Sequence, residues 1–233
     1  MKNGEIKRAF RATLPVLAGY LVLGIGFGML LNAKGYGIKW AIPMSVFIYS
    51  GTMQYLAVDM LAGGTTLPVA AVTTLVVNAR HLFYGISTVD RFKTAGKFKP
   101  YMIFALTDET YSIVTRDDIE GDDASVQKYR FFVSLFDHTY WIIGSALGSI
   151  LGSILKFDAS GMDFVLTALF VTTLIDQWMT NKDHLPALTG LIASLFCLII
   201  FGGDNFLIPS MILITVTLIV ADKIRKKRGD GND

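Results

Sequence analysis

Five short polar clusters interrupt the apolar stretches of this sequence, and they contain the side chains most able to do chemistry. They are YSGTMQ at 49–54, NARH at 78–81, LTDETY at 106–111, DHTYW at 137–141 and DQW at 176–178. Ionisable groups at membrane depth cost about 2.5–3.5 kcal/mol on insertion scales, so they tend to be paired and functional. We therefore treat the clusters as candidate sites for binding a charged or zwitterionic ligand and for moving protons.

Arg80 carries a permanent charge and five hydrogen-bond donors, so at membrane depth it needs an anion or several carbonyl groups. Asp108 and Glu109 are the nearest intramembrane acids in sequence. In a structural interpretation Arg80 pairs with one acid, which cancels most of the desolvation cost. In a functional interpretation Arg80 and Asn78 hold a substrate carboxylate while a spare acid accepts a proton. Adjacent helical residues point about 100° apart, so only one acid can face Arg80 squarely.

Ser50, Gly51 and Gln54 lie in an apolar run that also contains Pro43. They indicate an unwound point in a helix, where free backbone groups can bind a zwitterion. A kinked helix in which Ser50 bonds to its own backbone explains the same residues.

Two histidines and an acid are candidates for proton coupling or charge pairing. His81 and His138 titrate near neutrality, and Asp137 is next to His138, so a proton relay is one interpretation. Interfacial packing is the alternative, because Asp137 lies only about two helical turns into its apolar segment.

The remaining sequence is typical of a multi-span membrane protein. Of its 233 residues, 52% are hydrophobic and 17% are charged, against roughly 25% charged in soluble domains, and the mean hydropathy is +0.50. The net charge of +2 comes from short basic flanks of apolar segments, so we expect no nucleic-acid partner. The single cysteine, Cys197, excludes an intrachain disulfide, and we expect neither a metal nor a cofactor.

Apolar length, measured against a hydrocarbon core of about 30 Å, predicts eight candidate membrane segments. Seven of them cover residues 13–31, 38–61, 101–114, 131–155, 162–178, 185–201 and 206–221. The third in chain order starts at residue 67 and runs up to or through the motif NARHLFYG. We expect an all-α, polytopic helical membrane protein with seven or eight membrane segments, one of them broken or re-entrant. The transmembrane domain would span residues 13–221, between a basic cytoplasmic N-terminus (1–12) and a basic C-terminal tail (222–233). Residues 13–85 and 131–201 can be aligned as a weak internal repeat, as in many transporters.

Basic residues leave a conflict about orientation. The positive-inside rule puts the N-terminus, the C-terminal tail and the loop 91–99 in the cytoplasm. If the N-terminus and loop 91–99 are both cytoplasmic, the chain must cross the membrane an even number of times between them. Three apolar segments separate them, however. Either one segment is re-entrant, at YSGT or before Asn78, or the charge rule fails. The loop 116–130 has five acids and three bases, and we expect it on the outer side.

Small residues at four-residue spacing predict close helix packing. Gly24 and Gly28 lie in the first segment, and Gly144, Gly148 and Gly152 lie in the fifth. Each set forms a groove that another helix backbone can approach. We expect packing within the helix bundle, with a second subunit as the alternative partner for one groove.

The sequence lacks the motifs of membrane enzymes. It has no His-Glu-x-x-His pair, no glycine two residues before Ser50, no Gly-x-Gly-Asp arrangement at 202–205 and no glycine-rich phosphate loop. We therefore predict that the chain is not an enzyme and does not hydrolyse ATP itself.

The motifs SGTMQ, NARHLFYG, LTDET and the later GMDF at 161–164 resemble, in this order, those of the AzlC family of bacterial membrane proteins. The resemblance covers about residues 19–178. It implies a plasma-membrane exporter of branched-chain amino acids and their analogues. This large subunit would be driven by an ion gradient and would work with a small AzlD-type partner.

Such an exporter would have to desolvate both charges of its substrate. Arg80 and the Ser50–Gly51 backbone would meet the carboxylate, and Asp108 or Glu109 would meet the ammonium or carry the coupling proton. The alternatives are a transporter for another small zwitterion such as methionine, and a channel or assembly subunit.

Overall fold

The computed structural model describes residues 4–116, 119, 121–155, 167–168, 171–172, 174–175, 178–179, 183–203 and 206–229. Every regular element in these ranges is a helix. The chain divides into two compact units, Met1–Leu166 and Thr167–Asp233 (unit 1 and unit 2). The predicted segment 162–178 falls largely outside the described residues, as do Asp176 and Gln177 of the DQW cluster.

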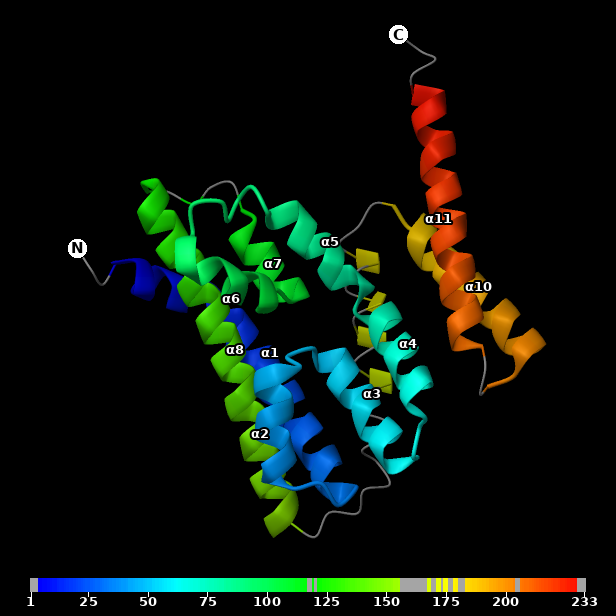
Figure 1. Ribbon diagram of the computed structural model, residues 1–233, viewed down its shortest axis with the longest axis horizontal. Helices are drawn as coiled ribbons and strands as arrows, with labels where there is room; N and C mark the ends of the chain where they lie inside the picture. The colour runs from blue at the N-terminus through cyan, green and yellow to red at the C-terminus, as the bar shows by residue number, and fades with distance from the viewer. Residues whose placement is uncertain are drawn as a thin grey trace. The chain divides into compact units, whose positions relative to one another are not determined.

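Two long parallel helices form the frame of unit 1 (Figure 1). α1 (Gly4–Ala33) and α8 (Asp123–Ile154) have 30 and 32 residues, so each is longer than the roughly 30 Å hydrocarbon core of a bilayer. The Thr13 hydroxyl lies 3.1 Å from the Tyr140 hydroxyl, and Asn32 Nδ2 donates to the Ser149 carbonyl at 3.2 Å. Residue numbers therefore rise together along both helices.

Glycine lets the backbones of α1 and α8 touch. A Cβ atom added to Gly24 would lie 2.9 Å from Ser145 N, and one added to Gly144 would lie 2.8 Å from Tyr20 O. The same seam contains the other glycines at four-residue spacing: Gly28, Gly148 and Gly152. The two predicted grooves thus face each other within one chain.

α2 (Ile38–Phe47) and α3 (Gly51–Ala62) reach halfway along α8 and return. At the turn, the carbonyl of Ser45 lies 3.2 Å from His138 Nε2. At the far end of α3, the Leu61 carbonyl accepts from the Tyr36 hydroxyl at 3.2 Å. The pair therefore starts and ends at the same end of unit 1. Tyr49, at the turn, has φ of 41°, a left-handed conformation that is strained for a bulky residue.

α4 (Leu67–Val77) and α5 (Ala79–Thr88) follow each other with a break at Asn78, where the two axes bend by 42°. By length and composition, α1 is the one described helix able to span a membrane, and α4–α5 is a second if the pair counts as one span. The count of seven or eight segments remains a prediction.

A second pair of helices reaches halfway from the other end. η1 (Gly96–Phe98) leads into α6 (Lys99–Phe104), and α7 (Asp108–Val114) returns. Near the turn, the Tyr101 hydroxyl lies 3.1 Å from His138 Nδ1. At the far end of α7, the Val114 carbonyl accepts from Arg130 Nε at 3.0 Å. The turn between α6 and α7 ends at Thr107, the N-cap residue of α7. The Thr107 hydroxyl oxygen accepts a hydrogen bond from the Thr110 amide at 3.2 Å.

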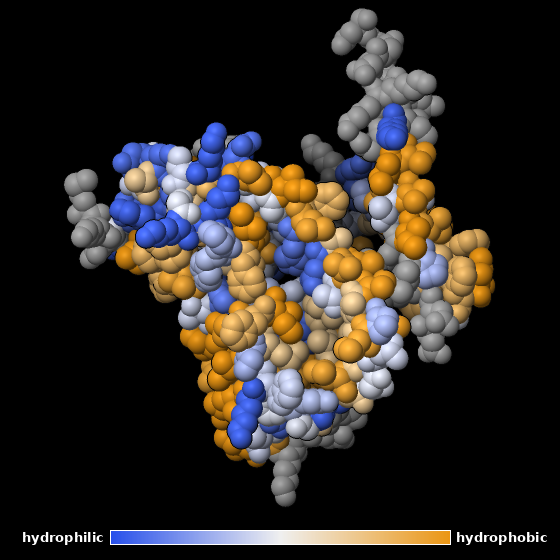
Figure 2. All heavy atoms as spheres, in the orientation of Figure 1, coloured by the Kyte–Doolittle hydropathy of each residue, from blue (hydrophilic) through white to orange (hydrophobic). Residues whose placement is uncertain are grey.

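One end of unit 1 gathers the N-terminus and both loops that flank α6 and α7. Ala9, Phe92, Ala95 and Tyr129 share a buried cluster there, and Arg130 Nη1 donates to the Arg91 carbonyl at 2.8 Å. Figure 2 shows this end, which we call the basic end, as largely hydrophilic. The described residues of loop 116–130 therefore pack at the same end of unit 1 as the N-terminus, whereas the charge pattern predicted them on the opposite side. Each of the two half-length pairs, α2–α3 and α6–α7, starts and ends at one end of unit 1.

Unit 2 contains α10 (Leu185–Phe201) and α11 (Leu207–Gly229), which pack against each other. The bounds of α10 coincide with those of the predicted seventh segment. α10 starts with Pro186 in its first turn, where the missing N–H of proline costs nothing. α11 continues past the predicted end at residue 221 into the basic tail, because Lys and Arg are good helix formers.

The glycine seam predicts different effects on stability for two alanine substitutions in α1. A Cβ at Gly28 would lie 2.5 Å from Ser149 N, whereas one at Gly19 meets nothing within 4 Å. We expect Gly28→Ala to cost about 1–3 kcal/mol by overpacking, and Gly19→Ala to cost nothing, because alanine is the better helix former. Thermal unfolding in detergent measures both. Equal midpoints for the two variants would contradict the seam.

Candidate functional site

Three helix breaks meet halfway along α1 and α8, and we call them the central breaks: residues 48–50, 78 and 105–107. The Ser50 hydroxyl donates to Asn78 Oδ1 at 2.7 Å. The rings of Tyr49 and Phe104 lie 6.3 Å apart between their centroids. Broken helices leave backbone groups unpaired, and in membrane proteins these are found where the chain lines a binding site or cavity.

Arg80 and Asp108 form an ion pair across the central breaks, between Nη1 and Oδ2. Nη2 donates to the Thr52 hydroxyl at 3.1 Å, and the Tyr84 hydroxyl donates to the other Asp108 oxygen. The side chains of Arg80 and Asp108 are 37% and 38% exposed, so one side of the pair is open to a ligand. Arg80 Nε is buried and has no hydrogen-bond partner among the described residues.

Figure 2 shows hydrophilic atoms enclosed by hydrophobic ones where α4, α5 and α7 approach one another in Figure 1. The Arg80–Asp108 ion pair joins α5 to α7. The pair offers opposite charges beside the central breaks, an arrangement suited to a small zwitterion.

Glu109 points away from Arg80, as the helical spacing of adjacent residues requires. Its Oε2 accepts from the Tyr20 hydroxyl of α1 at 2.7 Å. The next residue, Thr110, donates from its hydroxyl to Asp137 Oδ2 of α8 at 2.8 Å. Three consecutive residues of α7 thus contact three different helices, namely α5, α1 and α8.

Gln54 is fully buried, and protein groups occupy both ends of its amide. Oε1 accepts from Trp141 Nε1 at 2.8 Å, and Nε2 donates to the Ser45 hydroxyl at 3.3 Å. A Cβ on Gly51 would lie 3.0 Å from the Trp141 ring. Gln54 therefore links α2, α3 and α8, and Gly51 lets Trp141 pack against the start of α3.

The residues considered for proton coupling do not form one connected group. Asp137 is fully buried beside the turn of α7, whereas both nitrogens of His138 lie at hydrogen-bond distance from Tyr101 and the Ser45 carbonyl. His81 lies beside the Tyr84 ring, 6.0 Å between centroids, and its Nδ1 has no partner among the described residues. Neither histidine bonds to Asp137.

Sequence reasoning missed five polar side chains that complete the site: Tyr20, Thr52, Tyr84, Thr107 and Thr110. Thr52, Tyr84, Thr107 and Thr110 stand inside the motifs quoted above, so closer attention to hydroxyl groups there would have found them. Tyr20 lies in the first apolar segment, far from any polar cluster, and no local signal marks it.

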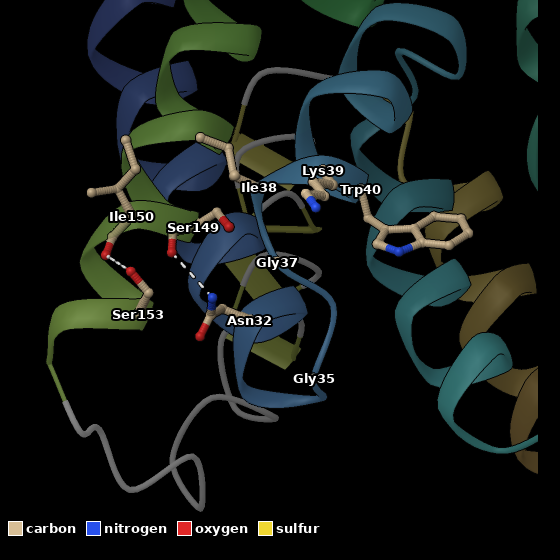
Figure 3. Close-up of a pocket in the computed structure, with 9 residues that line it drawn as sticks. All are labelled: Asn32, Gly35, Gly37, Ile38, Lys39, Trp40, Ser149, Ile150 and Ser153. Carbon is tan, nitrogen blue, oxygen red and sulfur yellow. Dashed lines mark hydrogen bonds between the residues drawn. The ribbon is translucent and has the colours of Figure 1, made fainter.

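A cavity in the described part of unit 1 lies away from the central breaks. It measures about 440 Å³ and is lined by the ends of α1, α2 and α8, including Asn32, Lys39, Trp40 and Ser149 (Figure 3). No residue predicted as a binding or coupling residue lines it. The candidate site is therefore the partly exposed ion pair and not this cavity.

Sequence comparisons identify relatives across nearly the whole chain. The sequence model of the AzlC protein family matches residues 15–155. The branched-chain amino acid transport protein AzlC of Bacillus subtilis is 44% identical over 97% of this chain and 90% of its own length. An uncharacterized membrane protein of Helicobacter pylori (strain 26695) is 38% identical over 93% and 95%, and the inner membrane protein YgaZ of Escherichia coli is 27% identical over 86% and 82%.

The comparison with solved structures gave no match. The family match covers more than half of the chain, including every central break and the Arg80–Asp108 ion pair. The chain therefore belongs to the AzlC family and is a membrane transport protein.

Proposed function

We propose that the chain exports branched-chain amino acids across the bacterial plasma membrane as the large subunit of a secondary transporter. An ion gradient would drive it, and a small AzlD-type membrane subunit would assist it. The observation that carries the proposal is the partly exposed Arg80–Asp108 ion pair at the meeting point of three helix breaks. The branched-chain class rests on the name of the Bacillus relative.

An amino acid brings one negative and one positive group, so it can exchange partners with a resident ion pair. Its carboxylate would take the place of Asp108 on Arg80, which has the fork geometry that suits carboxylates. Its ammonium group would pair with Asp108. Neither protein charge is left unpaired during the exchange, which avoids the cost of an isolated charge at membrane depth.

The start of α3 adds further donors for the carboxylate. The first amides of a helix have no intrahelical partner and attract anions. Thr52, in this first turn, already contacts Arg80, so these amides and the guanidinium act on the same region. Asn78, bonded to Ser50, fixes the break in α4–α5 against the start of α3.

The helix arrangement also suggests a membrane topology. In unit 1, α1, α4–α5 and α8 would cross the bilayer, while α2–α3 and α6–α7 would enter from opposite faces and return. Two crossings then separate the N-terminus from loop 91–99, which removes the conflict with the positive-inside rule. If segment 162–178, α10 and α11 each cross once, six crossings put both basic termini in the cytoplasm.

The proposed site predicts a loss of export when Asp108 is neutralised. Asp108→Asn would leave Arg80 without its counter-ion, and a hydrogen bond to a charged group contributes about 1.5–3 kcal/mol. We expect the rate to fall roughly ten- to hundredfold. The measurement is efflux of labelled leucine or valine from loaded cells that produce the chain.

Asp59→Asn is the matched control for Asp108→Asn, because Asp59 is 54% exposed in a surface pair with Lys34. This variant should export normally. Undiminished export by Asp108→Asn at normal membrane levels would exclude the proposed site. Reconstitution of the chain with and without its small partner then shows whether the transport path lies in this subunit.

The proposed topology predicts which sites share a membrane face. We expect cysteines placed at Gly37 and Thr65, on either side of α2–α3, to react with an impermeant thiol reagent from one face. A cysteine at Lys97 should react from the other face. The background would be Cys197→Ser, since Cys197 is the single native cysteine. Labelling of positions 37 and 65 from opposite faces would mean that α2–α3 crosses the membrane.

A further inference from the structure

A continuous chain of hydrogen-bonding side chains joins two carboxyl groups on different helices. From Glu109 Oε2 the distances are 2.7 Å to the Tyr20 hydroxyl, then 2.6 Å from Tyr20 to the Thr107 hydroxyl. They continue with 3.1 Å from Thr107 to the Thr110 hydroxyl and 2.8 Å from Thr110 to Asp137 Oδ2. All four distances lie in or close to the range of ordinary hydrogen bonds.

We propose that these five side chains form a proton relay, with Asp137 as the site that holds the coupling proton. The proposal rests on the proposed transport function for its role. The relay itself is a property of the chain's own oxygen atoms and can be tested without transport.

The protons of the relay balance in two states. Three hydroxyl hydrogens and one carboxyl proton fill the four hydrogen bonds. When the proton is on Glu109, each hydroxyl donates toward Asp137, which is a carboxylate. When the proton is on Asp137, each hydroxyl turns and donates toward Glu109. Every hydroxyl group accepts one bond and donates one in both states, as its chemistry allows, so a proton passes along the chain without any bond being left unfilled.

The two ends of the relay differ in their surroundings. Glu109 is exposed, whereas Asp137 is fully buried, and its Oδ1 has no hydrogen-bond partner in the part of the chain that the structure describes. Within the described residues, no Lys or Arg forms an ion pair with Asp137. An isolated buried carboxylate is costly, so a proton at this end is stabilised by removing the charge.

Several titratable groups surround Asp137, and none of them is a permanent cation. On α8 itself they are His138 and Tyr140. From the neighbouring elements they are Tyr20 of α1, Tyr49 between α2 and α3, Tyr101 of α6 and Glu109 of α7. Glu109 is the one other acid in this set, and its charge disfavours a second carboxylate at Asp137. A single carboxyl proton shared between Glu109 and Asp137 is what the proposed relay requires.

The relay also touches the proposed substrate site. Asp108, Glu109 and Thr110 are consecutive in α7, and Asp108 pairs with Arg80. A shift of α7 when a ligand replaces Asp108 on Arg80 would also change the bonds of Glu109 to Tyr20 and of Thr110 to Asp137. Substrate binding and the position of the proton are coupled through one rigid helical turn.

The first test uses infrared difference spectra of the purified full chain over a pH titration. We expect one component of the carbonyl stretch of protonated carboxyl groups to appear as the pH falls and to be missing from Asp137→Asn, while the components of the other acids remain. Asp123→Asn, in the exposed first turn of the same helix, is the control and should keep the band. A band that is unchanged in Asp137→Asn would overturn the proposal.

The second test separates proton coupling from substrate binding in vesicles that contain the chain. Asp137→Asn should lose accumulation of labelled leucine driven by a pH gradient, yet keep exchange of labelled for unlabelled leucine. Tyr20→Phe and Thr110→Val keep both carboxyl groups but break the relay. We expect them to slow the proton-driven rate by about tenfold, the effect of one lost hydrogen bond. Thr139→Val, on the exposed face of α8, should transport normally.

The outcomes distinguish the relay from the transport function. Proton-driven uptake at the wild-type rate in Tyr20→Phe and Thr110→Val would overturn the relay, even if Asp137→Asn fails to fold. Absence of leucine exchange in the wild-type chain would instead overturn the proposed function, and the infrared titration would still decide whether Asp137 binds the proton.

Discussion

The structure depends on compensating charges and free backbone groups at the place where three helices are broken. A helix satisfies its own backbone in lipid, but a break does not, so each break requires partners from elsewhere in the fold. Asn78 and Ser50 bond across two of the breaks, and Arg80 and Asp108 add opposite charges beside them. Because these groups bond to one another, a polar region can exist halfway along unit 1.

The frame and the half-length helix pairs have different mechanical characters. α1 and α8 touch along a glycine seam that leaves little room for sliding. The turns of α2–α3 and α6–α7 meet this frame through single side chains, such as His138 with Ser45 and Thr110 with Asp137. Motion that opens the site is therefore expected in the half-length pairs, which enter from opposite ends, while the frame stays fixed.

Much of this arrangement was predictable from local patterns in the sequence. Apolar length predicted α10 to the residue, the Ser50–Gly51 pair marked the first break, and helical spacing showed that one of Asp108 and Glu109 would face away from Arg80. What the sequence could not show is that two apolar segments turn back halfway. Apolar length is the same for a segment that crosses as for two short helices that return. Tyr20 was missed for a related reason, since its partners lie 87 and 89 residues away.

The most direct test of the site at the central breaks is protection of a cysteine by substrate. Thr52 contacts Arg80, so in a Thr52→Cys, Cys197→Ser chain the thiol would stand beside the proposed carboxylate position. The account predicts that leucine slows the reaction of this thiol with a small alkylating reagent, whereas leucinamide, which lacks the carboxylate, does not. Equal reaction rates with leucine, with leucinamide and without ligand would contradict a substrate site at the Arg80–Asp108 pair.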